Sequence, residues 1–129
     1  MPYQLGVDLG TTYSAAAVAT GGSVEIVQLG SSIAPIPSVV VLRDDGTVLV
    51  GEAAQRRSIF ESDRTAREFK RRLGDPTPYL LGGTPYGADA LTGYLLASIV
   101  ERVTSVRGED PASIALAHPA VYGPYKLGF

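Results

Sequence analysis

The sequence predicts a mixed α/β fold, in which a three-strand antiparallel meander and a parallel crossover strand form one sheet packed by helices. Short apolar strands separated by Gly-rich turns occupy residues 4–29. A pattern of apolar residues at helical period extends over residues 88–107, and the apolar run 113–117 follows shortly after it. A strand entered from a helix that packs on a sheet implies a right-handed crossover, so this strand should lie parallel to the first.

Composition limits the size and class of the protein. With 129 residues and 45% hydrophobic content, the chain is long enough for one core and too short for two sizeable domains. A net charge of −2 gives no electrostatic footprint for nucleic acid or an anionic membrane, and no apolar run approaches the roughly 20 residues that span a bilayer. The N-terminus lacks a basic signal-peptide segment, cysteine is absent, and His118 alone cannot form a metal cluster. We therefore expect a soluble, cytoplasmic protein.

The first hairpin carries the main chemical signal. Residues 4–9 alternate polar and apolar, which places Asp8 near the end of a strand, and a turn at Gly10-Thr11-Thr12 leads into a second strand through Ala19. Gly10 can adopt backbone angles closed to other residues, so main-chain N–H groups and the two threonine hydroxyls can converge on an anion such as phosphate. Asp8 adds a hard oxygen ligand for Mg²⁺ or for its bound waters. An ordinary hairpin, with Asp and Thr side chains capping the turn, is the alternative.

The middle of the chain is expected to form strands and then helices. The predicted elements are a third strand from Val24 to Leu29, strands at 39–42 and 48–50 joined by an Asp45-Gly46 turn, a helix over 52–59, and a helix capped by Ser62 or Asp63 that runs to Leu73. In this last helix, Ala66, Phe69 and Leu73 should share one face. Without other information Lys70 would lie on a solvated face, and Glu68 could pair with Arg72 four positions on.

The final part of the chain contains the longest predicted helix. Residues 76–85 are rich in Gly and Pro and should form a loop. The helix over 88–107 should bury one apolar stripe and end at Gly108, and its polar face has too few basic residues for a membrane-surface helix. The members of that stripe are Leu91, Leu95, Ile99, Val103 and Val106. The strand at 113–117 is expected to be buried.

Four segments resemble the DnaK-type (seventy-kilodalton heat-shock) chaperones, which belong to the actin, sugar-kinase and chaperone ATPase superfamily. The run Val7–Ser14 is similar to the first phosphate-binding hairpin of that family. Residues 36–54 resemble its P-S-x-V and V-G-x-x-A block, and residues 69–74 resemble its lysine-bearing segment. Residues 118–122 resemble its V-P-A-Y-F motif, although Val121 replaces the tyrosine.

The resemblance implies a fold and a set of site residues. The fold is the ribonuclease-H-like lobe of the actin-like ATPases, which binds ATP or ADP with Mg²⁺. The implied catalytic residues are Asp8, which organises the metal shell through water, and Lys70, which reaches the terminal phosphate and helps position the attacking water. The phosphate cradle is implied to consist of Gly10, Thr11, Thr12 and Tyr13. Pro119 is implied to relay nucleotide state to a substrate domain.

The same resemblance implies that residues 1–129 form only the first lobe of such a domain. An arm that is long in the family is short here, at about residues 75–87, and the Asp-Leu-Gly pattern of Asp8 does not recur for a second phosphate loop. We expect a fragment of a longer protein or a truncated member. The full-length protein would hydrolyse ATP to drive the binding and release of polypeptide clients with co-chaperones, whereas this chain alone should bind ATP weakly and be inactive.

Two other functions fit the same fold. A sugar or acyl kinase shares the D-x-G-T-T pattern, but no sugar-binding constellation is visible and residues 69–74 match the chaperones. A non-enzymatic interaction or filament module would retain the fold without activity, and Val121 and the short arm favour that alternative. An exposed edge at the last strand would also allow the chain to self-associate.

Overall fold

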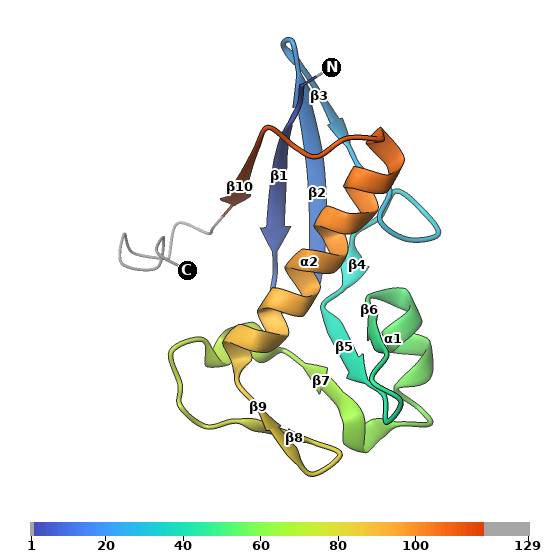
Figure 1. Ribbon diagram of the computed structural model, residues 1–129, viewed down its shortest axis with the longest axis vertical. Coiled ribbons are helices and arrows are strands. Elements are labelled where there is room, and N and C mark those ends of the chain that lie inside the picture. The colour runs from blue at the N-terminus through green and yellow to red at the C-terminus, as the bar shows by residue number, and fades with distance from the viewer. Residues whose placement is uncertain (1, 118–129) are drawn as a thin grey trace.

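The computed structural model describes residues 2–117 and has the mixed α/β class that the sequence predicts. Short strands fill most of the first half of the chain, and one long helix dominates the second half (Figure 1). The elements are β1 (Gln4–Leu9), β2 (Tyr13–Thr20), β3 (Ser23–Ile26), β4 (Ile36–Pro37), β5 (Val39–Leu42), β6 (Val48–Val50), α1 (Glu52–Arg57), η1 (Ser62–Arg64), β7 (Thr65–Arg67), η2 (Phe69–Arg72), β8 (Tyr79–Leu81), β9 (Thr84–Tyr86), α2 (Ala88–Arg107) and β10 (Ser113–Ala117).

The larger sheet has the strand order β10-β1-β2-β3, and β4 pairs with β2. The pairs β1–β2 and β2–β3 are antiparallel, whereas β10 lies parallel to β1 with Gly6 opposite Ala115. Leu5, Val7 and Leu9 alternate with polar or small residues and enter the main core, which also contains the buried stripe of α2. Helix α2 therefore covers one face of this sheet, as Figure 1 shows.

Helix α2 has the bounds that its periodicity predicts, and it ends at a glycine. Gly108 adopts a left-handed conformation, with φ of 77°, and its N–H donates to the Thr104 carbonyl at 2.8 Å, so it closes the helix as a C-cap. Four members of the predicted stripe are fully buried, but Val106, in the last turn of the helix, is 61% exposed. The four buried members are Leu91, Leu95, Ile99 and Val103.

A second sheet, of order β6-β5-β7, forms the other half of the molecule. Every residue of β5 is buried, because its two faces meet different partners. Val40 and Leu42 enter the main core, whereas Val39 and Val41 pack with Ala54 of α1 in a smaller cluster. This sheet is therefore enclosed between the main core and α1.

The helix predicted from Ser62 or Asp63 to Leu73 is wrong. The segment is divided into η1, β7 and η2, because residues 65–67 pair antiparallel with β5, Ala66 lying opposite Val40. Ala66 and Phe69 are nevertheless buried, and Leu73 packs against the same core. The apolar pattern thus identified the buried residues, but strand pairing with β5 decided their backbone conformation.

Other boundaries also differ from the sequence prediction. Residues 76–85 were expected to form a loop, but β8 and β9 make a hairpin there, whose turn residues Gly82 and Gly83 both have positive φ, 59° and 85°. Two left-handed residues are what a two-residue hairpin turn requires, and the Gly-Gly pair is a known signal for it. The third strand ends at Ile26 and α1 at Arg57, earlier than predicted.

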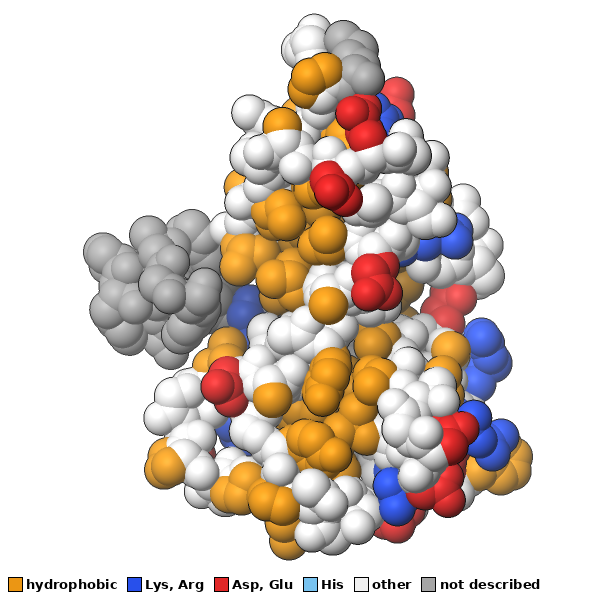
Figure 2. Space-filling view, viewed as in Figure 1, with side chains coloured by type: hydrophobic (Ala, Val, Ile, Leu, Met, Phe, Trp, Pro, Cys, Tyr) orange, Lys and Arg blue, Asp and Glu red, His pale blue; other side chains and the backbone are white. Residues whose placement is uncertain are grey.

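The prediction that residues 113–117 form a buried strand is wrong, because the strand β10 is exposed. It is the end strand in the sheet order. Ile114 projects to the same face as Leu5, its partner in β1, yet Ile114 is 46% exposed. Figure 2, seen from the side of α2, shows hydrophobic side chains over the middle of the molecule and a group of charged side chains along its lower right edge. Within residues 2–117, no helix is long and apolar enough to cross a membrane.

Shortening one core leucine of α2 should be far more damaging than shortening its exposed valine. Leu95→Ala removes a fully buried side chain and should lower the free energy of unfolding by about 2–5 kcal/mol. Val106→Ala should change it by no more than about 0.5 kcal/mol. Urea unfolding followed by circular dichroism measures both, and equal effects would contradict the burial of the Leu95 face of α2.

Candidate functional site

The turn between β1 and β2 is built around a close approach at Gly10. A Cβ atom on Gly10 would collide with the carbonyl oxygen of Tyr13, so no other residue fits without moving the backbone. The expectation that Gly10 uses unusual backbone angles is wrong, because it is absent from the glycines with positive φ. Its role is steric: the missing side chain lets the turn fold tightly.

The carbonyl and N–H groups of this turn differ in their hydrogen bonding. The carbonyl oxygen of Gly10 accepts from the Ser38 hydroxyl at 2.7 Å, and that of Thr12 accepts from the Ser38 N–H at 2.9 Å. In the described part of the chain, the N–H groups of Gly10, Thr11 and Thr12 have no hydrogen-bond acceptor. Two of the three carbonyls of the turn are thus engaged inside the protein, while its N–H groups remain available to an anion.

Ser38 and Ser14 support the turn, a role that the sequence did not reveal. Ser38 is 3% exposed and Ser14 1% exposed, and their hydroxyls lie 2.8 Å apart. The sequence predicts no chemical role for any residue of the block 36–54, yet Ser38 is the residue that holds the turn. A buried serine directly after a proline is a signal that could have suggested a specific hydrogen-bonding role, because buried hydroxyls are nearly always paired.

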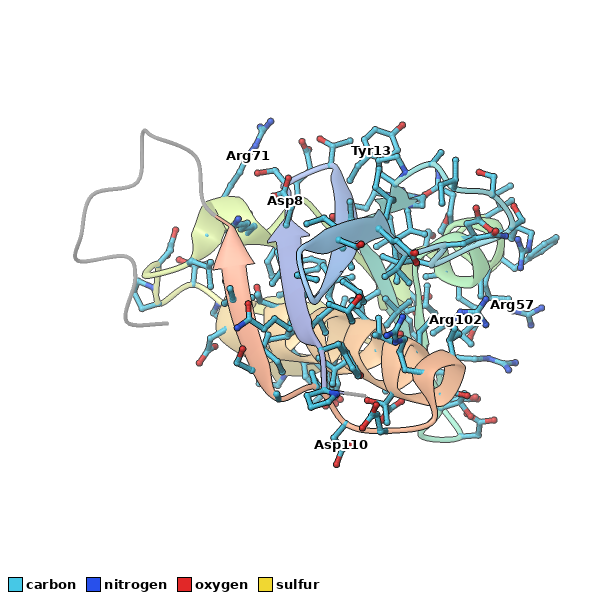
Figure 3. All side chains as sticks on the ribbon, turned by 90° about the horizontal axis from the view of Figure 1, so that it is seen from above. Asp8, Tyr13, Arg57, Arg71, Arg102 and Asp110 are labelled. Atoms are coloured by element: carbon cyan, nitrogen blue, oxygen red, sulfur yellow. The ribbon has the colours of Figure 1, made fainter. Side chains whose placement is uncertain are left out.

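Asp8 and Tyr13 flank the turn on the open side of the sheet. Asp8 alternates with the buried Val7 and Leu9, so its carboxylate projects away from α2, and it is exposed. Tyr13 is 59% exposed. Figure 3 shows both side chains at the same edge of the molecule, opposite α2. Residues 2–117 contain no group of three or more His, Cys, Asp or Glu that could hold a metal ion.

Lys70 comes to this turn from a distant part of the chain. It lies in η2, next to Phe69, which is buried in the main core and anchors the segment. The Lys70 ammonium donates a hydrogen bond to the carbonyl oxygen of Leu9, the residue between Asp8 and Gly10. The carboxylate, the turn and the amine are therefore neighbours in space.

The residues around Lys70 shape the approach of its side chain. Glu68, directly before η2, is left-handed with φ of 53°, and it is the one non-glycine residue of the described chain with positive φ. Glu68 pairs with Arg71 at 3.2 Å, so the predicted pairing with Arg72 is wrong. Arg72 instead lies over the Tyr79 ring, with its guanidinium carbon 4.6 Å from the ring centre. Partial burial raises the pKa of the Tyr79 hydroxyl, against the opposing effect of Arg72.

One predicted site residue cannot be placed. Pro119, with the rest of the predicted motif at residues 118–122, lies outside the described residues.

Comparison with known proteins identifies the family of this chain. The family model described as Hsp70 protein matches residues 4–78, more than half of the chain, and the match includes β1, the turn, Ser38 and Lys70. The chain belongs to the Hsp70 family. Membership in the Hsp70 family favours the chaperone class over the kinase class.

Individual relatives extend the similarity along the chain. The chaperone protein DnaK of Elusimicrobium minutum is 34% identical over 122 residues, that of Endomicrobium trichonymphae 33% over 124, and that of Cenarchaeum symbiosum 32% over 122. Each alignment covers 92% of this chain. The chain spans only about a fifth of the length of these Hsp70 relatives, 19% or 20% of each.

Removing the Ser38 hydroxyl should loosen the turn. Ser38→Ala leaves the Ser14 hydroxyl and the Gly10 carbonyl without this partner, which should cost about 1–3 kcal/mol of unfolding free energy. It should also shift or broaden the backbone amide NMR signals of residues 10–13.

A second buried serine provides the control for this prediction. Ser58→Ala removes a hydroxyl that donates to Gln55 and accepts from Arg67, each at 2.7 Å, so it should destabilise the chain without disturbing the turn signals. If both variants perturb residues 10–13 equally, Ser38 has no specific role in the turn.

Proposed function

We propose that this chain is the first lobe of the nucleotide-binding domain of a DnaK-type chaperone ATPase, with the ribonuclease-H-like fold of the actin-like ATPases. The observation that carries the proposal is the contact between the Lys70 ammonium and the Leu9 carbonyl, beside Asp8 and the β1–β2 turn. A triphosphate seated on the turn would lie within reach of both a carboxylate and an amine. This pairing of a cation ligand with phosphate donors is what a magnesium–nucleotide complex requires.

The residues of the turn would bind the phosphates. The N–H groups of Gly10, Thr11 and Thr12, which have no acceptor among the described residues, would donate to phosphoryl oxygens, together with the threonine hydroxyls and Tyr13. Asp8 would accept hydrogen bonds from the waters of Mg²⁺. The magnesium ion, when bound with the nucleotide, would neutralise phosphate charge.

Lys70 would act on the terminal phosphate. Its compact ammonium on a flexible stem can exchange the Leu9 carbonyl for a phosphoryl oxygen with a small movement of the side chain. In that position it would stabilise the charge of the transferred phosphoryl group and help orient the attacking water, since phosphoryl transfer depends on positioning and charge stabilisation. Lys70 and Asp8 are therefore the proposed catalytic residues.

The remaining parts of the catalytic unit would come from outside this sequence. A second lobe would supply the base and ribose contacts, a second phosphate loop and the general base. The full-length protein would couple ATP hydrolysis to the binding and release of polypeptide clients with co-chaperones, and Pro119 would relay the nucleotide state. In the isolated chain, the end position of β10 and the exposure of Ile114 support edge-to-edge self-association.

The isolated chain should bind Mg²⁺–ATP only weakly. Contacts to phosphate alone leave the base and ribose free, so we expect a dissociation constant well above about 1 μM and no hydrolysis above background. Lys70→Ala should weaken this binding roughly tenfold or more, because it removes a charge-assisted contact. NMR titration of the amide signals of residues 8–13 measures the affinity.

A matched loss of charge tests whether this binding is specific. Arg57→Ala removes an arginine that pairs with Glu61 at 2.6 Å, and it should leave ATP binding unchanged. Submicromolar binding by the wild-type chain would contradict the one-lobe assignment. Equal weakening by the two variants would remove Lys70 from the site.

In the full-length protein, Lys70→Ala and Asp8→Asn should each slow ATP turnover. Removing one group that stabilises developing charge typically costs on the order of 10²–10³-fold in kcat. Single-turnover phosphate release measures the effect, with Arg57→Ala again as the control. Wild-type rates in either variant would exclude that residue from catalysis.

A further inference from the structure

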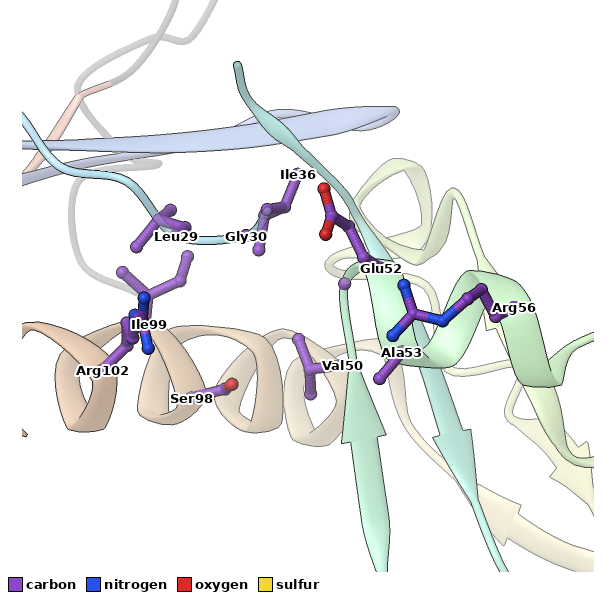
Figure 4. Close-up of a pocket in the computed structure, with 11 residues that line it drawn as sticks. Leu29, Gly30, Ile36, Val50, Glu52, Ala53, Arg56, Ser98, Ile99 and Arg102 are labelled. Atoms are coloured by element: carbon purple, nitrogen blue, oxygen red, sulfur yellow. The ribbon is translucent and has the colours of Figure 1, made fainter. Parts of the chain in front are cut away.

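The strand β3 is a free edge of the larger sheet, at the opposite end of the strand order from β10. All four of its residues are exposed, and in the described part of the chain no strand pairs with its outer side. Beyond Ile26, the side chains of Val27 and Leu29 pack against the main core, and Leu29 lines a cavity together with Ile99 of α2 (Figure 4). The free edge is therefore centred on residues 23–26, which include none of the predicted nucleotide-site residues.

The backbone groups of Val24 and Ile26 point away from the sheet. In an antiparallel pair of strands, residue pairs that exchange hydrogen bonds alternate with pairs that do not. The Val27 N–H donates to the Ala16 carbonyl of β2 at 2.9 Å, so the next pair along, which contains Ile26, is one that does not exchange hydrogen bonds. Val24, two residues earlier, has the same orientation as Ile26. The N–H and C=O groups of these two residues are thus directed at the open edge, where a further strand would meet them.

The side chains of Val24 and Ile26 lie on the face of the sheet that α2 does not cover. Their cross-strand partners are Ala19 and Ala17, which alternate with the buried Val18, and cross-strand partners project to the same face. These small partners leave the larger side chains uncovered, since Val24 is 71% exposed and Ile26 64% exposed. A free edge with exposed apolar side chains is a template for pairing with another chain.

Glu25, between these two residues, decides which strand fits the edge. Within residues 2–117 its carboxylate makes no hydrogen bond or ion pair. A second copy of the chain, paired antiparallel so that both Val24 and Ile26 are bonded, would place Glu25 opposite its own copy. Like charges directly opposite each other destabilise a strand pair, whereas opposite charges stabilise it. The charge of Glu25 therefore favours a partner strand with a basic residue at this position over pairing between two copies.

We propose that β3 binds an extended polypeptide segment of the pattern apolar–basic–apolar, which adds an antiparallel strand to the larger sheet. The two apolar residues of the segment exchange main-chain hydrogen bonds with Val24 and Ile26 and pack against their side chains. The basic residue pairs with Glu25 on the other face. In this mode of recognition the main-chain bonds supply affinity, and the alternate side chains supply specificity.

The proposal is tested by titrating the full chain with the capped peptide Thr-Val-Lys-Val-Thr, followed by amide NMR signals and hydrogen exchange. We expect saturable shifts in β3 and slower exchange of the Val24 and Ile26 N–H groups, which in the free chain should exchange faster than the N–H of Glu25. A peptide with glutamate in place of the lysine should bind at least about threefold more weakly.

Methylation of the peptide backbone tests whether the segment binds as a strand. N-methylation of both valines should weaken binding at least about tenfold, because it removes the N–H groups that donate to the β3 carbonyls. N-methylation of the lysine should leave binding unchanged, because its N–H points away from β3. Equal weakening by the two modifications would overturn the proposal.

Variants of the chain test the position and the charge of the site. Glu25→Lys should reverse the preference between the lysine and glutamate peptides, and Ile26→Thr should weaken binding about threefold or more. Ile114→Thr makes the matched change at the opposite edge, in β10, and should leave the affinity unchanged. Absence of saturable shifts in β3, an unchanged peptide preference in Glu25→Lys, or β3 signals that move with protein concentration in the absence of peptide would each overturn the proposal.

Discussion

The buried hydroxyl of Ser38 is the contact on which the geometry of the β1–β2 turn depends. It donates to the Gly10 carbonyl while its own backbone N–H donates to Thr12, so one residue fixes two carbonyls of a three-residue turn. A peptide whose carbonyl is held on one side must present its N–H on the other, because the two groups point in opposite directions along a planar unit. Ser38 therefore sets the direction of one of these donors, the Thr11 N–H, which shares a peptide unit with the Gly10 carbonyl, without touching a ligand. Ser38 also lies between β4, which pairs with β2 of the larger sheet, and β5, the central strand of the smaller one. Ser38 thus holds the turn at the place where the two sheets join.

The position of Lys70 depends on the same junction. Strand β7 pairs with β5, and Phe69 enters the main core, so η2 begins at a fixed place relative to β1. A lysine side chain has several rotatable bonds, and a loosely held backbone would spread its ammonium over a wide volume. Anchoring by Phe69 restricts that volume to the neighbourhood of Leu9 and Asp8. The site is therefore assembled from residues distant in sequence, with two buried residues, Ser38 and Phe69, as its supports.

Features that depend on local sequence were predictable, and those that depend on distant pairing were not. Helix α2 and its Gly108 cap follow from apolar period and glycine chemistry, and β1 follows from alternation. Residues 62–73 also have a helical pattern, but pairing of residues 65–67 with β5 overrides it.

A similar limit applies to the prediction of the site. The resemblance named Asp8, the turn residues and Lys70, but it gave Ser38 no role, since its role exists only when β4 lies against the turn. Exposure of Ile114 likewise reflects the end position of β10 in the sheet, which a single strand pattern cannot reveal.

The failure of the helix prediction at Glu68 has a physical meaning for the site. A continuous helix would keep Lys70 on a regular surface spiral, where Ala66 and Phe69 fix its direction by helical period alone. The left-handed conformation of Glu68 instead excludes a continuous helix between β7 and η2. A non-glycine residue in that region carries a conformational cost of order 1–3 kcal/mol, and such residues persist where the surrounding structure imposes them. Here the pairing of β7 with β5 fixes the chain before Glu68, and the burial of Phe69 fixes the chain after it. The residue with this conformational cost, Glu68, lies close to Lys70, the proposed catalytic residue. Local sequence preference and the structure disagree there, as is expected at a functional site.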